Sequence, residues 1–241
     1  MARMQEITAL DGALLVDKPA GPTSHDIVDN IRRHFNLRKV GHCGTLDPGA
    51  TGLLIIVLGR GTKLSEKLMS SDKVYEGQAK FGETTDSFDA DGEILSTNLI
   101  PPLTLEQVNE EAAKFTGDLM QLPPMVSAVK VGGVPLYKLA RKGQEVERKE
   151  RLVHIYTYRF TRYEEPFGTF RVACTKGTYV RSLVHDLGQR FGCGAHLRNL
   201  RRVDSGKFSV NDAATYEDIL NWSQAELEKH VIPFFQLARA E

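Results

Sequence analysis

One carboxylate, Asp47, lies in the middle of the turn-rich run GHCGTLDPGATG, which extends from Gly41 to Gly52. The proline at position 48 disfavours helical backbone angles at the residue before it, so we expect an extended Asp47. The glycines of the run allow backbone angles and close approaches that a Cβ atom would forbid. An Asp-Pro pair can also simply begin a turn. A turn alone needs neither so many glycines nor the nearby His42, so the pattern favours a rigid loop that presents an acid for chemistry.

Other arrangements that could carry chemistry are weaker. His42 and Cys43 could form a nucleophile pair, but adjacent residues on a loop seldom face each other. The acidic segment from Gly82 to Gly92 could bind calcium, yet it lacks the residue order of an EF-hand loop. Cys43, Cys174 and Cys193 include no C-x-x-C pair. We therefore expect no metal site and no disulfide framework.

The loop leads directly into the apolar run from Leu53 to Leu58, which has the length of a buried strand and would anchor the loop in a sheet. A second buried strand is expected at Ala13 to Val16. Apolar and polar residues alternate from Lys73 to Phe81, which predicts a strand whose Tyr75 side chain points inward. Two further alternating runs, Leu152 to Tyr163 and Gly168 to Cys174, predict an antiparallel pair.

Helices are expected between these strands. Ser24 is the predicted N-cap of the first, and Thr104 with Gln107 forms a capping box for another. Thr178 is the predicted N-cap of a third. Helices at Thr62 to Met69, Pro135 to Lys142 and Tyr216 to Val231, and a last strand at Gly206 to Val210, complete the prediction. Strands and helices interleave without a regular βαβ rhythm, which favours an α+β fold with a mainly antiparallel sheet.

Arg181 stands at the N-terminal end of the helix that follows Thr178. A cation at this end of a helix is repelled by the helix dipole. The position therefore predicts that Arg181 has a specific anionic partner.

Acidic and basic residues balance, with 31 Lys and Arg against 31 Asp and Glu, so a polyanion would have to bind to a local basic patch. The densest basic stretch lies between Lys130 and Arg151 and is a natural contact for phosphates. No apolar segment has the length of a signal peptide core or a membrane span. With so few cysteines, a reducing cytoplasm is the simplest expected location.

Six segments together resemble a known family. They are LLVDKPAGPTSHD, GHCGTLDPGATGLL, KVYEGQAKFGETTDSFDADG, PPMVSAVKVGG with LYKLARKG, GTYVRSLVHDLG and GAHLRNLRR. In this order they resemble the bacterial tRNA pseudouridine-55 synthases of the TruB family. Cys43 departs from the Ala or Thr that is usual in the family, and we interpret it as a tolerated small residue.

The resemblance implies the pseudouridine synthase fold, a mixed and mainly antiparallel sheet flanked by helices. It implies isomerisation of uridine-55 in the T arm of tRNA, without a metal or an organic cofactor. Asp47 would be the nucleophile towards a flipped-out uridine, through C1′ or C6 or by assisting a glycal intermediate. The other implied roles are stacking on the base by Tyr75, pocket lining by Tyr179 and Leu200, pairing with Asp47 by Arg181, filling of the vacated base position by His42, and support of the loop by Lys18.

The resemblance also bears on domains and partners. Residues 1–210 would form the catalytic domain and 211–241 a short helical tail, because the residues after Val210 are too few for the complete PUA domain that many relatives carry. RNA-backbone contacts are expected from Lys130, Lys138, Arg141, Lys142, Arg198, Arg201 and Arg202. We expect a monomer that works without guide RNA. The alternative is a non-catalytic module that binds or folds tRNA on the same scaffold.

Overall fold

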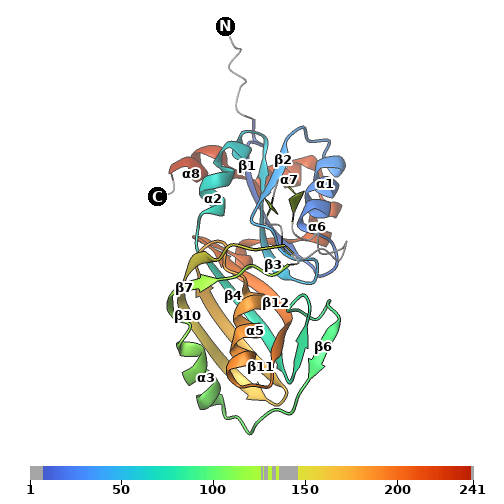
Figure 1. Cartoon of the computed structure of the whole chain (residues 1–241). Helices are drawn as coiled ribbons and strands as arrows, with labels where there is room; N and C mark the ends of the chain where they lie inside the picture. The colour runs from blue at the N-terminus through green and yellow to red at the C-terminus, as the bar shows by residue number, and fades with distance from the viewer. Residues whose placement is uncertain (1–7, 126, 128–129, 132–133, 136–145, 240–241) are drawn as a thin grey trace. The chain divides into compact units, whose positions relative to one another are not determined.

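A computed structural model gives the fold of the chain (Figure 1). It describes residues 8–125, 127, 130–131, 134–135 and 146–239. The chain forms two compact units, one made of Met1–Lys73 with Arg201–Glu241 and the other of Val74–Leu200. Residues 211–239, within the predicted short helical tail, fall in the same unit as the N-terminal strands.

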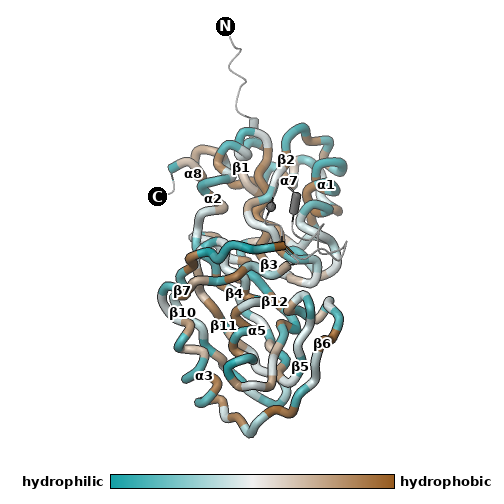
Figure 2. Tube along the Cα trace, in the orientation of Figure 1, coloured by the Kyte–Doolittle hydropathy of each residue, from teal (hydrophilic) through white to brown (hydrophobic). Residues whose placement is uncertain are grey.

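The sheet of the first unit is built around β3 (Thr51–Leu58), the apolar run predicted as a buried strand. Its antiparallel neighbours are β1 (Gly12–Lys18) and β2 (Val40–Cys43). Two short strands, β14 (Ala214–Thr215) and β15 (Ile232–Pro233), pair with β1. Every residue from Leu53 to Leu58 is almost fully buried, and the colouring by hydropathy shows hydrophobic residues in brown along this strand (Figure 2).

The helices of the first unit differ in detail from the prediction. α1 (Ser24–His34) is capped by Thr23 in a capping box with Asp26, so Ser24 is not the N-cap. A 3-10 turn, η1 (Gly59–Leu64), precedes α2 (Ser65–Met69). The predicted helix from Tyr216 to Val231 is divided into α6 (Tyr216–Asn221) and α7 (Gln224–His230), because Ser223 begins a new capping box with Glu226. α8 (Phe234–Arg239) ends the described chain.

The second unit contains the strand order β12-β4-β11-β10-β7. β4 (Lys73–Phe81), β10 (Arg151–Glu164) and β11 (Phe167–Cys174) match the predicted strands closely, and β10 pairs with β11 in antiparallel register. The edge strand β7 (Gly117–Gln121) pairs antiparallel with β10. β12 (Ala195–Ser205) also supplies residues from 201 onwards to the first unit.

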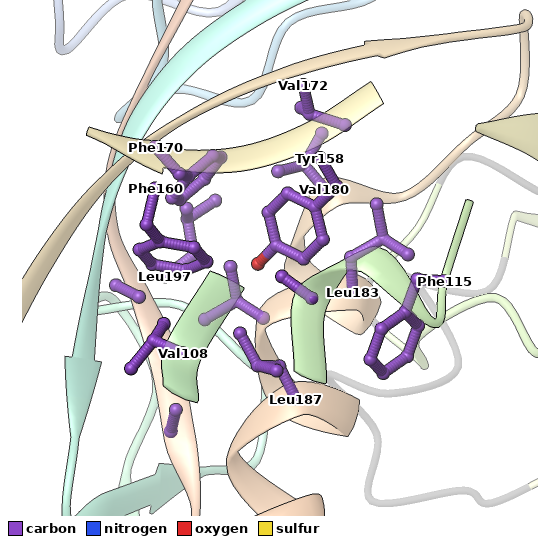
Figure 3. Packing of buried hydrophobic residues seen from close by; sticks show 14 of the residues in the cluster. Val108, Phe115, Tyr158, Phe160, Phe170, Val172, Val180, Leu183, Leu187 and Leu197 are labelled. Carbon is purple, nitrogen blue, oxygen red and sulfur yellow. The ribbon is translucent and has the colours of Figure 1, made fainter. Parts of the chain in front are cut away.

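In the described part of the second unit, the helices are α3 (Leu105–Ala113) and α5 (Val180–Arg190). The predicted capping box of Thr104 with Gln107 is confirmed, whereas α5 begins after Tyr179, so the predicted N-cap Thr178 is wrong by one residue. Figure 3 shows the core of this unit, where Val180, Leu183 and Leu187 of α5 lie among aromatic rings of β10 and β11. This dense packing fixes α5, whose first turn carries Arg181.

The remaining elements are small. β5 (Glu83–Thr85) pairs with β6 (Ile94–Thr97), and β8 (Lys130–Val131) pairs with β9 (Val134–Pro135). The predicted strand at Gly206 to Val210 is reduced to β13 (Phe208–Ser209), followed by the 3-10 turn η2 (Val210–Asp212). The helix predicted from Pro135 to Lys142 lies almost entirely outside the described residues. The predicted α+β class, with a mainly antiparallel sheet flanked by helices, is confirmed.

Candidate active site

The loop that carries Asp47 joins β2 to β3. These strands pair antiparallel with each other, with Cys43 opposite Ile55, so both ends of the loop are fixed in the sheet. The Ala50 N–H donates to the Asp47 carbonyl oxygen at 3.1 Å, which closes a turn, and Asp47 is exposed. Asp47 therefore begins a turn and is also exposed at the surface of this unit.

Lys18, at the end of β1, is completely buried and its ammonium group lies under the loop. Its Nζ donates to three carbonyl oxygens, those of Pro19 at 2.9 Å, Pro48 at 3.1 Å and Ala50 at 2.7 Å. An ammonium group has three N–H donors, so these three acceptors use them all. Lys18 thus contacts Pro48 and Ala50, two of the three residues that follow Asp47 in the turn, as a supporting role requires.

The charge of Lys18 depends on its surroundings. The pKa of the Lys18 ammonium is lowered from 10.5 to about 8, and burial is the largest cause. The Asp47 carboxylate acts to raise this pKa, and the Arg202 guanidinium acts to lower it. The attraction between Lys18 and Asp47 is electrostatic support for an ionised carboxylate at this loop.

Arg202 is a second buried cation beneath the loop, with 1% of its surface exposed. Its Nε donates to the Leu53 carbonyl oxygen at 2.7 Å and its Nη2 to that of Gly44 at 3.0 Å. With these two bonds and almost no exposed surface, the guanidinium is hardly accessible to a phosphate. The RNA-backbone role predicted for Arg202 does not fit this position, and we assign Arg202 to holding the loop.

The close approach of β12 explains one glycine of the loop. Gly52 has a φ of +98°, and a Cβ atom there would collide with the backbone carbonyl oxygen of Arg202. β12 and β3 pair in parallel at this point, with Arg202 opposite Gly52. Only glycine satisfies both the left-handed backbone and the short distance.

Ser24 is a residue of this site whose role the sequence pattern did not reveal. It is buried, its Oγ donates to the Leu46 carbonyl oxygen at 3.1 Å, and it accepts from the Leu46 N–H at 2.9 Å. The hydroxyl therefore ties α1 to the residue before Asp47. The sequence around Ser24 correctly indicated the start of a helix. It did not indicate that the Ser24 hydroxyl would bind Leu46.

His42 and Cys43 lie at the end of β2. Burial lowers the pKa of His42, with Arg202 and His25 acting in the same direction, so the imidazole is neutral at pH 7. Its Nδ1 is buried and has no hydrogen-bond partner among the described residues. Burial raises the pKa of the Cys43 thiol to about 11. A thiol of this kind is inert, which removes the Cys-His alternative.

The second unit places Arg181 at the start of α5, with 4% of its surface exposed. Its Nη1 donates to the Ser87 carbonyl oxygen and to Asp89 Oδ2, both at 3.0 Å. Asp89 is therefore an anionic partner of the expected kind. It belongs to the acidic segment that the sequence analysis considered only as a calcium site. The predicted pairing of Arg181 with Asp47 joins residues of different units and stays a prediction.

Tyr179, the N-cap of α5, is fixed through its backbone by Gln121 of β7. Gln121 has 3% of its surface exposed, and nothing in the sequence pattern marked it. Tyr75 and Leu200 are partly buried and pack against the same hydrophobic core that contains Val180. The three predicted pocket residues thus lie in one unit, with Tyr75 and Leu200 against this core and Tyr179 next to Val180 in the chain.

The predicted RNA-backbone residues have different surroundings. Arg198 is exposed, and its guanidinium lies over the Phe167 ring at 4.8 Å from the centroid. Arg201 donates two hydrogen bonds to the Asp17 carboxylate, at 2.9 and 2.7 Å, so its charge is already paired. Lys130 lies on β8, and Lys138, Arg141 and Lys142 are outside the described residues.

Within the described part of the chain, no group of three or more His, Cys, Asp or Glu side chains is arranged to hold a metal ion. None of the described helices is long and apolar enough to cross a membrane. The carboxylates of the acidic segment accept hydrogen bonds from nearby groups instead: Ser87 Oγ and the Asp91 N–H donate to Asp89 Oδ1, and the Glu93 N–H donates to Asp86 Oδ1.

Comparison with known families decides what this arrangement belongs to. Residues 32–180 match the family model described as TruB family pseudouridylate synthase, N-terminal domain, and residues 181–237 match that of the tRNA pseudouridylate synthase B C-terminal domain. The chain belongs to the TruB family. The predicted resemblance is confirmed, and with it the class of enzyme, an isomerase that converts uridine to pseudouridine in tRNA.

Two relatives illustrate the similarity. The chain is 53% identical to the tRNA pseudouridine synthase B of Opitutus terrae, over 95% of both proteins. It is 46% identical to that of Dechloromonas aromatica, over 93% of this chain and 75% of the other protein.

Among solved structures, the chain is similar to one from a Cbf5-Nop10-Gar1 complex, with a TM-score of 0.75 and 28% identity. That match covers 95% of this chain and 62% of the other. A second, from an H/ACA RNP bound to a substrate RNA, has a TM-score of 0.72 and 25% identity over 95% of this chain and 61% of the other. The TruB-family chain thus shares its fold with proteins that are solved in larger assemblies.

Proposed function

We propose that this TruB-family chain isomerises uridine-55 in the T arm of tRNA, with Asp47 as the nucleophile. The observation that carries the proposal is that two buried cations bind the backbone of the loop that contains Asp47. Lys18 donates to the carbonyl oxygens of Pro48 and Ala50, and Arg202 donates to that of Gly44. Two cations under an exposed carboxylate favour its ionised form, which is the form a nucleophile needs.

The reaction moves a glycosidic bond. The bond between C1′ and N1 of the uridine breaks, a bond between C1′ and C5 forms, the C5 hydrogen leaves as a proton, and N1 gains a proton. Nothing is oxidised or reduced. Asp47 would act at C1′ or C6, or assist a glycal intermediate, and all three routes remain open.

The target base must leave the RNA stack, at a cost of about a few kcal/mol. We propose that Tyr75, Tyr179 and Leu200 receive it, since all three belong to the second unit, Tyr75 and Leu200 pack against one core, and Tyr179 precedes the core residue Val180. His42 would take the place of the flipped base in the RNA.

Pairing of Arg181 with Asp47 would further stabilise the carboxylate. We also propose that Lys130, Lys138, Arg141 and Lys142, with Arg198 and Arg201, contact the RNA backbone. The solved relatives come from a Cbf5-Nop10-Gar1 complex and an H/ACA RNP, whereas we propose that this chain works as a monomer without guide RNA. A tRNA substrate is consistent with the predicted cytoplasmic location.

Release of tritium from C5 tests the activity. Nuclease-treated protein is mixed with unmodified tRNA that carries tritium at uridine C5, and released tritium is measured over time. We expect release from a tRNA with uridine at position 55 and none when that position is cytidine. Absence of release would contradict the enzymatic function and favour the non-catalytic tRNA-binding alternative. Light scattering during turnover reports the oligomeric state.

The role of Asp47 is tested with Asp47→Asn, which we expect to lower the rate by roughly 10³-fold or more. The matched control is Asp212→Asn, an exposed carboxylate of the same unit that lies outside the proposed site. A rate within about twofold of wild type for Asp47→Asn would remove Asp47 from the chemistry.

A further inference from the structure

The imidazole of His185 and the ring of Phe88 form a close stack in the second unit. The ring centroids are 3.8 Å apart and the planes meet at 17°. His185 lies on α5, one helical turn after Arg181, so the two side chains project from the same side of the helix. Phe88 lies between Ser87 and Asp89, which supply the two acceptors of Arg181. One short segment is thus held by one face of α5 at adjacent points.

The backbone of Phe88 shows that this segment needs to be held. Its φ is +65°, in the left-handed region that a phenylalanine rarely adopts. Such a conformation is strained for a residue with a Cβ atom and persists only when its surroundings enforce it. The Phe88 carbonyl oxygen accepts from the Leu197 N–H at 2.9 Å, which fixes one side of the residue. The stack with His185 holds the ring on the other side.

The segment in turn fixes Asp89. Ser87 Oγ donates to Asp89 Oδ1 at 2.5 Å, and the Asp91 N–H donates to the same atom at 3.1 Å. These contacts leave Oδ2 directed to Arg181. A rotation at Phe88 would displace Ser87 O and Asp89 Oδ2 together, and both acceptors of Arg181 Nη1 would move.

The imidazole of His185 contributes to this contact as a flat aromatic ring and not through a hydrogen bond or a charge. Its Nδ1 is buried and has no hydrogen-bond partner in the described part of the chain. Burial lowers the pKa of His185, so the ring is neutral at pH 7 and stacks as an aromatic surface. A phenylalanine at this position would keep the stack and would remove the unsatisfied nitrogen.

We propose that the Phe88–His185 stack is a positioning device for Arg181: it fixes the left-handed turn that presents Ser87 O and Asp89 Oδ2 to the guanidinium. The inference rests on the proposed function insofar as Arg181 supports the reaction of Asp47. His185 and Phe88 are positioning residues that touch neither the reacting atoms nor, in this role, the RNA.

The kinetic test uses steady-state tritium release over a range of tRNA concentrations, well below the melting temperature. We expect His185→Ala to lower kcat about tenfold with KM within about twofold, and His185→Phe to restore kcat to within about threefold of wild type. Phe88→Gly accepts the left-handed φ but lacks the ring, so it should fold and still show the loss. His185→Phe as slow as His185→Ala, or Phe88→Gly as fast as wild type, would overturn the proposal.

The matched control is His230→Ala. It removes a similar stack, on Trp222 at 4.0 Å and 20°, from the other unit and away from Arg181. We expect wild-type kcat from this variant. A loss equal to that of His185→Ala would show a general stability effect and overturn the proposal.

A double-mutant cycle shows whether the stack acts through Arg181. In an Arg181→Lys background, His185→Ala should have little further effect on kcat. Full additivity of the two losses, or an Arg181→Lys variant with wild-type kcat, would overturn the proposal.

A readout without activity separates this inference from the proposed function. The NMR signal of the Arg181 Nε–H group is assigned by its loss in Arg181→Lys. We expect it to shift and to exchange faster with solvent in His185→Ala and to return in His185→Phe. An unchanged signal in His185→Ala would overturn the positioning role even if tritium release supports the enzyme, and a changed signal would support it even if Asp47→Asn were fully active.

Discussion

Gln121 holds the backbone of Tyr179 with both ends of its side-chain amide. Its Nε2 donates to the Tyr179 carbonyl oxygen at 3.0 Å, and its Oε1 accepts from the Tyr179 N–H at 2.7 Å. Tyr179 is the N-cap of α5 and its own side chain makes no capping hydrogen bond. Gln121, from an edge strand, therefore fixes the backbone at this helix start, and its Oε1 accepts the N-cap N–H as the N3 side chain of a capping box does elsewhere.

Gln121→Ala should impair both stability and activity. It removes two buried hydrogen bonds, so we expect the free energy of unfolding to fall by about 1–3 kcal/mol. We also expect kcat/KM for tRNA to fall about tenfold, because Tyr179 loses its fixed position. Gln189→Ala, at the exposed end of α5, is the control and should change stability by about 0.5 kcal/mol or less. Normal kcat/KM in a destabilised Gln121→Ala would contradict the positioning of Tyr179.

Lys18 predicts a pH dependence of stability. Its pKa is about 8 in the folded chain, against 10.5 for an exposed lysine. Between these values the unfolded chain binds more protons than the folded chain, so this group makes the free energy of unfolding rise with pH from about 8 to 10.5. Below about pH 8 the buried charge is fully present in the folded state and this gain is absent.

Denaturant unfolding of wild type and Lys18→Met across this pH range isolates the effect. Because other lysines and tyrosines titrate in the same range, the difference between the two proteins is the relevant quantity. We expect wild type to gain stability relative to Lys18→Met as pH rises. A constant difference would mean that Lys18 has an ordinary pKa in the folded chain.

Gly52→Ala should be much more harmful than Gly192→Ala, although both glycines have a left-handed backbone. Its Cβ atom would meet the backbone of Arg202, whereas a Cβ atom at Gly192, with a φ of +72°, would meet nothing within 4 Å. We expect Gly192→Ala to lower the free energy of unfolding by about 1 kcal/mol from backbone strain alone. Gly52→Ala should lower it by about 2 kcal/mol or more beyond that and abolish tritium release. Equal effects would argue against a close contact of β3 with β12.

Arg198 and Arg201 should differ in their contribution to tRNA binding. Arg198 is exposed, whereas Arg201 is already paired with Asp17. We measure the dissociation constant between 50 and 200 mM salt and compare the slopes of log affinity against log salt. Arg198→Gln should reduce the slope by about 0.7–0.9, the value for one phosphate contact, and Arg201→Gln should change it less. The reverse order would show that Asp17 releases Arg201 to the RNA.

The densest basic stretch predicts the strongest effect on binding. Neutralising Lys138, Arg141 and Lys142 together should reduce the same salt slope by about 2 or more. An unchanged slope would show that the affinity for tRNA comes from elsewhere on the chain.

Local patterns in the sequence determined most of the elements. The alternation from Lys73 to Phe81, the apolar run from Leu53 to Leu58 and the capping box of Thr104 each gave the correct element, because these signals depend on near neighbours along the chain. The glycines and the Asp-Pro pair likewise marked the loop of Asp47. The six family segments were sufficient to recognise the TruB family.

Tertiary structure decided which residues hold these elements. Sequence reasoning assigned Arg202 to RNA, yet the parallel pairing of β12 with β3 buries it under the loop. The helix dipole predicted an anionic partner for Arg181, but only the folded chain showed that this partner is Asp89. Gln121 and Ser24 gave no signal, since their partners, Tyr179 and Leu46, are far away in sequence. A hydrogen bond between distant segments leaves no periodic trace in the chain, so its partner is determined by packing.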